Sequence, residues 1–359
     1  MSTVTESSEK KSVLPENINE LVDATKCPSG YTKVELSTKG YFGAPEVFHV
    51  RNFSTEELLI LGQSDEDDYV EHLIEALQAI IWEKDVDIKK FHEKEVIELL
   101  ILLYRTFYTK VIPNMTYELY DADYDYLGDI YKGKDTAEYK QRILDLENGR
   151  ENPVFDLMLD SISFKEAKQQ NTAYITKPDG FSCKFGFPCL GDTLLLKDYT
   201  ELMFKNEDKQ FEKIRKIYKL RRKAEDEAFR GKDIDLRNIG DITDADKAKL
   251  KEYEKKRSLF LIRGATAQYL REYKGEDVSN LTLDKRMAIV ANDPDFDYLT
   301  FKKFSEAFKE NVEPGPVEKI KCFSPIQRRT VERPYTFQLV SLLKAFTVGD
   351  TDKTSIEFV

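Results

Sequence analysis

Residues 50–57 read VRNFSTEE, and this stretch marks a change from strand to helix. Ser54 is a residue type that caps helix N-termini. Glu57 follows three positions later, where its carboxylate can bond back to the backbone amide of Ser54. Phe53 stands just before the cap and can pack on the first turn as a hydrophobic staple. The stretch therefore predicts a helix that begins at Ser54.

The residues on both sides of this stretch complete a small unit. Short strands are predicted at 31–36 and 46–51, because Gly and Pro residues separate two strand-like runs. Helices are predicted at 66–82 and 93–108, where apolar residues recur at helical spacing. Residues 31–112 thus form a first predicted α/β unit.

Long charged helices dominate the second half of the chain. They are predicted at 200–230 and 245–273, and the short segment between them indicates an antiparallel helical hairpin. Helices of roughly 30 residues span about 45 Å, so we expect the hairpin at about 200–273 to project from its unit. The other elements predicted in this half are strands at 193–197, 317–323 and 335–337 and helices at 283–291 and 299–311.

The two halves share short patterns in the same order. Residues 50–54 and 196–200 both read apolar, basic, Asn or Asp, aromatic, hydroxyl, which puts Thr200 in the place of Ser54 as a helix cap. Chance recurrence of a short pattern is the alternative explanation.

A second pair of patterns follows further along. Residues 85–91 and 295–301 both read Asp-x-Asp-apolar-x-x-Phe, and Asp87 and Asp297 are placed to cap the next helix. We interpret the halves as a duplicated strand–helix–helix–strand unit with the hairpin inserted into the second copy. The predicted fold class is α+β, predominantly helical.

Composition defines the remaining divisions. The polar residues at the N-terminus bury too little apolar area to fold alone, so we expect disorder or an arm that orders on a partner. The predicted divisions are an N-terminal arm at 1–30, the first unit at 31–112, an irregular Tyr/Asp-rich connector at 113–180, the second unit at 181–346 and a C-terminal tail at 347–359.

Charge and cysteine content exclude several classes of protein. The formal net charge is −11, so the chain as a whole lacks the basic footprint of a nucleic-acid-binding protein. The four cysteines form no CxxC pair, which favours a reducing compartment over a disulfide framework. No stretch reaches about 18 uninterrupted apolar residues, so no membrane span is expected.

No familiar catalytic pattern is present. His49, His72 and His92 are far apart in sequence and have no metal-ligand spacing. The chain has no GxSxG elbow, no GxxxxGK[ST] loop and no GxGxxG after a strand. We therefore expect a protein that is not an enzyme, with no catalytic residue and no cofactor.

Two short patterns resemble metal sites without completing them. Asp121, Asp123 and Asp125 alternate as in a calcium loop, but the required glycine and glutamate are replaced by other residues, which favours a solvated acidic loop. Cys183 and Cys189 are spaced more widely than zinc ligands usually are, so we expect them to pack against the aromatic residues nearby.

A basic run at 213–223 is the strongest local charge feature. Nucleic-acid binding is one reading. Acidic residues flank the run on both sides and apolar residues are interleaved at helical spacing, which favours a solvated helix face or a face that docks an acidic protein. The residues of this candidate partner-binding face are Lys213, Arg215, Lys216, Lys219 and Arg222.

Residues 33–40, KVELSTKG, bear a likeness to a known family. The stretch resembles the opening phrase of T-even-type myovirus baseplate hub proteins, which continues with a strand, an arginine and a Thr-x-Glu-Glu helix start, as at 50–57. The likeness is continuous over about 33–112 and looser over 193–197 and 281–346. Two departures stand out: Ser37-Thr38 replaces Pro-Ser, and no Cys-x-x-Cys pair follows Cys322, so the metal ribbon of many relatives is not expected.

The resemblance implies a structural or assembly subunit of the baseplate hub of a contractile phage tail. Its implied partners are other hub, wedge or tail-tube subunits in a multimeric particle, with the chain in host cytoplasm during assembly and then in the virion. Two alternatives remain: a tail-assembly chaperone absent from the mature virion, and a nucleic-acid-binding phage protein that uses the basic run.

Overall fold

The computed structural model of the chain mixes helix and strand, with helix predominating, so the predicted α+β class is confirmed. Within the part of the chain that the structure describes, no helix is both long and apolar enough to cross a membrane. The described residues are 29–63, 68–132, 136–147, 153–167, 171–176, 182–229, 243–294, 296, 302–303, 305–306, 313–317, 319–337, 339, 342 and 346.

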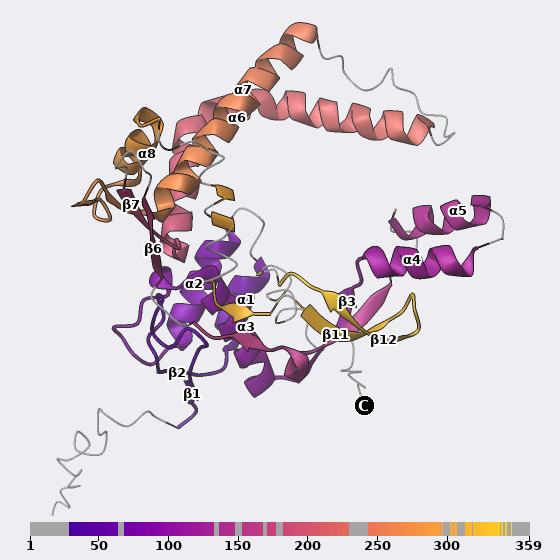
Figure 1. Cartoon of the computed structure of the whole chain (residues 1–359), viewed down its shortest axis with the longest axis horizontal. Coiled ribbons are helices and arrows are strands. Elements are labelled where there is room, and N and C mark those ends of the chain that lie inside the picture. The colour runs from indigo at the N-terminus through magenta and orange to yellow at the C-terminus, as the bar shows by residue number, and fades with distance from the viewer. Residues whose placement is uncertain are drawn as a thin grey trace, which may run out of the picture.

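The helical elements are distributed along the whole described chain (Figure 1). They are α1 (Thr55–Gln63), α2 (Tyr69–Ile80), the 3-10 turn η2 (Ile88–Lys90), α3 (Glu93–Phe107), α4 (Asp121–Ile130), α5 (Thr136–Glu147), the 3-10 turn η3 (Leu159–Ser161), α6 (Leu190–Phe229), α7 (Asp244–Tyr269) and α8 (Leu283–Asn292).

The strands form small antiparallel sheets. The two-stranded pairs are β1 (Thr32–Val34) with β2 (Phe48–Val50), β3 (Val111–Thr116) with β4 (Val154–Met158), β5 (Phe164–Lys165) with β10 (Gly315–Pro316), and β11 (Lys319–Ser324) with β12 (Arg329–Pro334). A four-stranded sheet has the order β6 (Thr172–Thr176), β7 (Ser182–Gly186), β8 (Leu270–Tyr273) and β9 (Glu276–Asp277).

Helix α3 lies at the centre of the main hydrophobic core. Its residues 96–101 are buried all round the helix, which is the pattern of a helix enclosed by other elements. The same core takes Phe48 from β2, Leu77 from α2 and Ile320 and Cys322 from β11. The C-terminal strands therefore pack on the first predicted unit, although they are distant from it in sequence.

A second, smaller core lies beside the four-stranded sheet. It joins Phe185 of β7 to Leu270 of β8 and to Met287 of α8. Ala267, near the end of α7, is also fully buried there. This core holds the bases of the two longest helices.

Helices α6 and α7 form the predicted pair of long helices. Phe204 and Phe211 of α6 pack with Leu250 and Tyr253 of α7 in a cluster of their own. Figure 1 shows that the two helices cross, that their outer parts diverge, and that both extend away from the rest of the molecule. We call this pair, residues 190–229 and 244–269, the arm.

The strand predicted at 193–197 is wrong. These residues belong to the first turns of α6, and Thr200 is no helix cap, because it lies inside the helix and its hydroxyl donates to the carbonyl of Leu196 over 2.6 Å. A short apolar run such as 194–196 fits a strand or a buried helix equally, and leucine is a strong helix former. Residues 193–197 are therefore not an equivalent of the strand that precedes the helix in the first half.

The duplication is consequently not confirmed. Asp87 does act as a cap, since its carboxylate accepts from the amide of Lys89 over 3.0 Å, but it caps η2 and not the long helix that follows. Helix α3 is capped instead by His92, through a capping box with Glu95. Asp297 lies outside the described residues.

The Tyr/Asp-rich segment predicted as an irregular connector contains regular elements. Helices α4 and α5 and strands β3 to β6 all lie between 111 and 176. Asp121, Asp123 and Asp125 belong to α4, so the acidic loop expected there is wrong. Asp123 is fully buried and accepts from the hydroxyl of Tyr117 over 3.0 Å and from the amide of Gln327 over 2.8 Å.

Other predicted elements differ mainly in their bounds. The first helix starts at Thr55 as α1 and is separate from α2. The strand predicted at 335–337 is wrong, because β12 ends at Pro334 and residues 335–337 have no regular structure. Most of the helix predicted at 299–311, and both predicted tails apart from residues 29 and 30, lie outside the described residues.

Candidate functional site

The Ser54 helix start forms part of a local ion-pair network. The amide of Ser54 donates to the Glu57 carboxylate over 2.6 Å, as the capping pattern predicts, and the Ser54 hydroxyl donates to the same carboxylate. The Arg51 guanidinium donates to Glu57 over 2.7 Å and to the carbonyl of Ala79 over 3.1 Å. Arg51 thereby ties the start of α1 to the end of α2.

The segment with the family-like phrase is held by two buried carboxylates of α3. Glu98 accepts from the amide and hydroxyl of Ser37 over 2.8 and 2.6 Å. Glu95 accepts from the amides of Gly43 and Ala44 over 3.2 and 3.1 Å. These bonds fix residues 37–44, which we call the Ser37 loop, against the N-terminal half of α3.

Burial of the two carboxylates changes their acidity. Loss of water around Glu95 and Glu98 raises the pKa of each carboxyl above its ordinary value, and the charge of Glu95 raises the pKa of Glu98 further. Sequence patterns did not identify either residue. The available signal was a pair of glutamates three positions apart, of which Glu98 interrupts an otherwise apolar run at 96–103.

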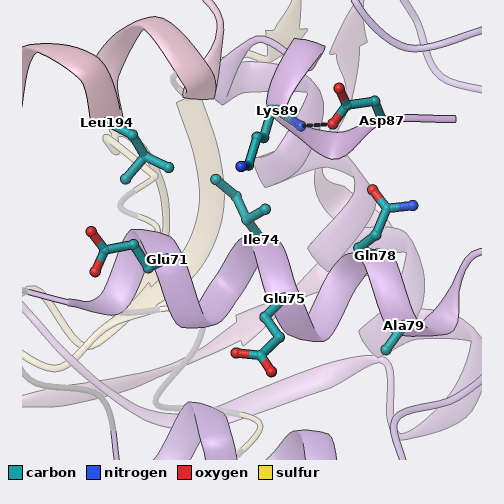
Figure 2. A pocket seen from close by; sticks show the side chains of 8 residues that line it. All are labelled: Glu71, Ile74, Glu75, Gln78, Ala79, Asp87, Lys89 and Leu194. Carbon is teal, nitrogen blue, oxygen red and sulfur yellow. Dashed lines mark hydrogen bonds between the residues drawn. The ribbon is translucent and has the colours of Figure 1, made fainter.

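A groove lies where α2, η2 and α6 meet. Its volume is about 690 Å³. Figure 2 shows the side chains of Leu194, Lys89 and Ile74 converging, with Glu71 and Glu75 along α2. The residues that line it are Glu71, Ile74, Glu75, Gln78, Ala79, Asp87, Lys89 and Leu194.

The walls of this groove are fixed by specific bonds. The Lys197 ammonium of α6 lies 3.0 Å from the Glu71 carboxylate of α2. The Gln78 side chain donates to the carbonyl of Val86 over 2.8 Å and accepts from the amide of Ile88 over 3.1 Å. Three carboxylates and one ammonium line the groove, so its charge is negative, and an apolar floor lies between them.

The base of the arm is locked by buried charges. Asp192, in the first turn of α6, lies 3.2 Å from the guanidinium of Arg271 on β8 and 3.4 Å from that of Arg286 on α8. The Gln268 amide of α7 donates to the backbone carbonyl of Asp192. Arg286 is buried, so this carboxylate compensates a charge that water does not reach. The arm therefore starts from a rigid base.

The surface of the arm carries apolar side chains that the fold does not cover. Leu202 is 72% exposed and Leu220 is 56% exposed on α6, and Leu259 is 45% exposed on α7. Met203, beside Leu202, is 53% exposed. Several such residues on one projecting element are typical of a surface that contacts another molecule.

The candidate partner-binding face lies on the outer half of α6. Arg215 lies 3.2 Å from Asp208 and 5.0 Å from the ring centre of Tyr253, and Lys216 lies 2.6 Å from Glu212. Part of the positive charge of the run is therefore compensated within the arm, which favours contact with protein over nucleic acid. The side chains of Lys213, Lys219 and Arg222 lie outside the described residues.

The three histidines occupy separate places. His49 lies 2.6 Å from Glu83, and His72 lies 3.5 Å from Asp68. His92 is buried at the start of α3, where its ring contacts Phe42 and Phe187. The structure does not bring the three imidazoles together.

The cysteines are also separate. Cys183 is buried in the second core with Phe185, and Cys189 contacts the Asp192 carboxylate at the start of α6. Among the described residues, no three His, Cys, Asp or Glu side chains gather as a metal site requires. Comparison with known proteins adds nothing to this geometry: no protein family, curated protein or solved structure matches the chain.

Proposed function

We propose that this chain is a structural or assembly subunit of the baseplate hub of a contractile phage tail. The observation that carries the proposal is the arm, which is locked at its base by Asp192 and exposes Leu202, Met203 and Leu220 beyond the cores. A projecting helix pair adds little to the stability of its own domain, so its use is contact with other subunits. Those partners are other hub, wedge or tail-tube subunits.

The Ser37 loop supports the same family. The family-like phrase at 33–40 overlaps the Ser37 loop at residues 37–40, and Ser37 within it donates to the Glu98 carboxylate of α3. Its residues are therefore tied to the central helix of the main core. We propose that the chain is in the host cytoplasm during assembly and in the virion afterwards.

The test is a chain with a shortened arm. Residues 212–249 are replaced with a short Gly-Ser linker, which keeps Phe204, Phe211, Leu250 and Tyr253 and so preserves the packing that pairs the helices. We expect the shortened chain to fold, as judged by circular dichroism and thermal unfolding, but not to enter baseplates when it replaces the natural chain in its phage.

Point variants distinguish the effect of removing the arm's contact surface from the effect of shortening the arm. Leu202→Glu with Met203→Glu keeps the arm but removes its exposed apolar surface, and we expect it to reduce incorporation as well. Leu59→Glu is the matched control, because Leu59 is 58% exposed on α1 and lies outside the arm. Normal incorporation of the shortened chain would contradict the proposal.

Two alternatives predict different results. An assembly chaperone would be absent from purified particles although needed to form them. A nucleic-acid-binding protein would show DNA binding that falls steeply as salt rises, because cationic side chains that contact phosphates release bound counterions. The ion pairs of Arg215 and Lys216 within the arm give no support to that second alternative.

A further inference from the structure

Opposite charges are segregated into two stretches of this chain. Between Glu56 and Glu83 every Asp, Glu, Lys or Arg position is acidic, and between Lys213 and Lys223 every such position is basic. The acidic stretch includes α2, which supplies one wall of the groove. The basic stretch lies in the outer half of α6, where α6 and α7 diverge in Figure 1.

The groove has the composition of a site for a basic, amphipathic segment. Glu71, Glu75 and Asp87 line the groove with one ammonium, that of Lys89, and with the apolar side chains of Ile74 and Leu194 (Figure 2), so its net charge is negative. A lysine or arginine side chain can lay its aliphatic stem on such a floor and direct its charge to the carboxylates. The basic stretch also supplies apolar contact area, because Leu220 is 56% exposed.

The two complementary surfaces of one molecule are held apart. Leu194 lines the groove and belongs to the same continuous helix as Lys213. The two positions are nineteen residues apart, which corresponds to about 28 Å along the helix at about 1.5 Å per residue. Because both positions belong to one continuous helix, the basic stretch cannot fold back onto the groove of its own molecule.

We propose that the groove of one copy binds the basic stretch of α6, residues 213–223, from a second copy of this chain. The contact joins two different surfaces, so it is head-to-tail. Repetition gives a ring if the rotation closes and an open chain if it does not. The proposal builds on the contact role proposed for the arm, but a chain that enters baseplates without self-association would contradict the self-association alone.

The test uses sedimentation velocity of the full-length protein with charge reversals. Glu75→Lys reverses an exposed groove carboxylate, and we avoid Glu71 because it holds Lys197. The arm variant carries Lys213→Glu, Lys219→Glu and Arg222→Glu. We expect the wild-type chain to self-associate at low salt and each variant to do so at least about ten-fold more weakly.

Mixing the two variants gives the decisive result. The groove variant still has a normal arm and the arm variant a normal groove, so the mixture regains association between unlike chains. A chain with both sets of reversals regains self-association. These gains of binding also show that the variants are folded.

The controls are reversals of exposed charges elsewhere. Glu138→Lys lies on α5, and Lys251→Glu lies on the opposite helix of the arm. Both should associate as the wild-type chain does. The proposal is overturned if the wild-type chain is monomeric at low salt, if the reversals leave association unchanged, or if the mixture gives no complex. A monomer that binds DNA through the basic stretch would likewise overturn it.

Discussion

Ser37 donates both its amide and its hydroxyl to the buried carboxylate of Glu98, over 2.8 and 2.6 Å. The two residues are 61 positions apart, so this contact fixes a loop near the start of the described chain to the central helix of the core. One turn earlier, Glu95 holds the other end of the same loop. The loop is therefore a part of the core structure.

Removing the Glu98 carboxylate should destabilise the protein. In Glu98→Ala the amide of Ser37 loses its buried acceptor, which costs about 2 kcal/mol in the free energy of unfolding. Urea unfolding measures this change. Glu93→Ala, at an exposed position of α3, is the control and should change stability by less than about 0.5 kcal/mol. Equal effects of the two substitutions would show that the Ser37 contact adds nothing.

The same residue gives a pH dependence of known sign. Burial raises the pKa of Glu98, so its carboxyl binds its proton more tightly in the folded state than in the unfolded state. Its contribution to stability is present below the unfolded pKa of about 4.3 and is lost as pH rises through the folded pKa. Glu98→Gln should remove this decline, as measured by unfolding at a series of pH values.

Glu57 should show the opposite dependence. The Arg51 guanidinium, 2.7 Å away, lowers the pKa of Glu57 to about 2. Its contribution is present above the unfolded pKa of about 4.3 and is lost as pH falls through the folded pKa. Wild-type protein should lose stability over that acidic range, and Glu57→Gln should lose less. If the stability of the variant falls with decreasing pH as much as that of the wild-type protein, this ion pair does not have the role given to it.

Gly43 tests how closely the Ser37 loop approaches η2. A Cβ atom at Gly43 would lie 1.6 Å from the backbone carbonyl oxygen of Lys90, so Gly43→Ala cannot be accommodated without moving the backbone. We expect a loss of about 3 kcal/mol or more. Gly128→Ala is the matched control, since α4 leaves open space there, and it should stabilise the helix by up to about 1 kcal/mol.

The base of the arm can be tested at Asp192. Asp192→Ala leaves Arg271 and the buried Arg286 without their shared carboxylate, which should cost about 3 kcal/mol. Hydrogen exchange should increase at the start of α6 and in α8, and not in α3. Increased exchange throughout the main core would show that the network supports the whole fold and not the arm alone.

Local patterns predicted elements with strong, uninterrupted signals. Helix 93–108 was predicted within one residue of α3, because its apolar residues continue for several turns. The region 193–197 was misread, because a short run of leucines has no period that separates strand from helix. The prediction that Thr200 caps a helix, and its match to Ser54 as a repeat position, were wrong for the same reason.

Contacts between residues far apart in the sequence could not be predicted from local patterns. Nothing near Glu95 and Glu98 indicates that their partners lie about fifty to sixty residues earlier. Cys322 of β11 and Phe48 of β2 share one core, which no comparison of neighbouring residues could show. The arm was predictable because charge and length are local properties of its two helices.

The most direct measurement is quantitative mass spectrometry of baseplates isolated from purified phage particles. We expect this chain in every preparation, at a constant ratio to the other hub subunits, and we expect its loss from particles made with the arm shortened at 212–249. Particles that are complete and infectious but contain none of the chain would contradict the structural role proposed here.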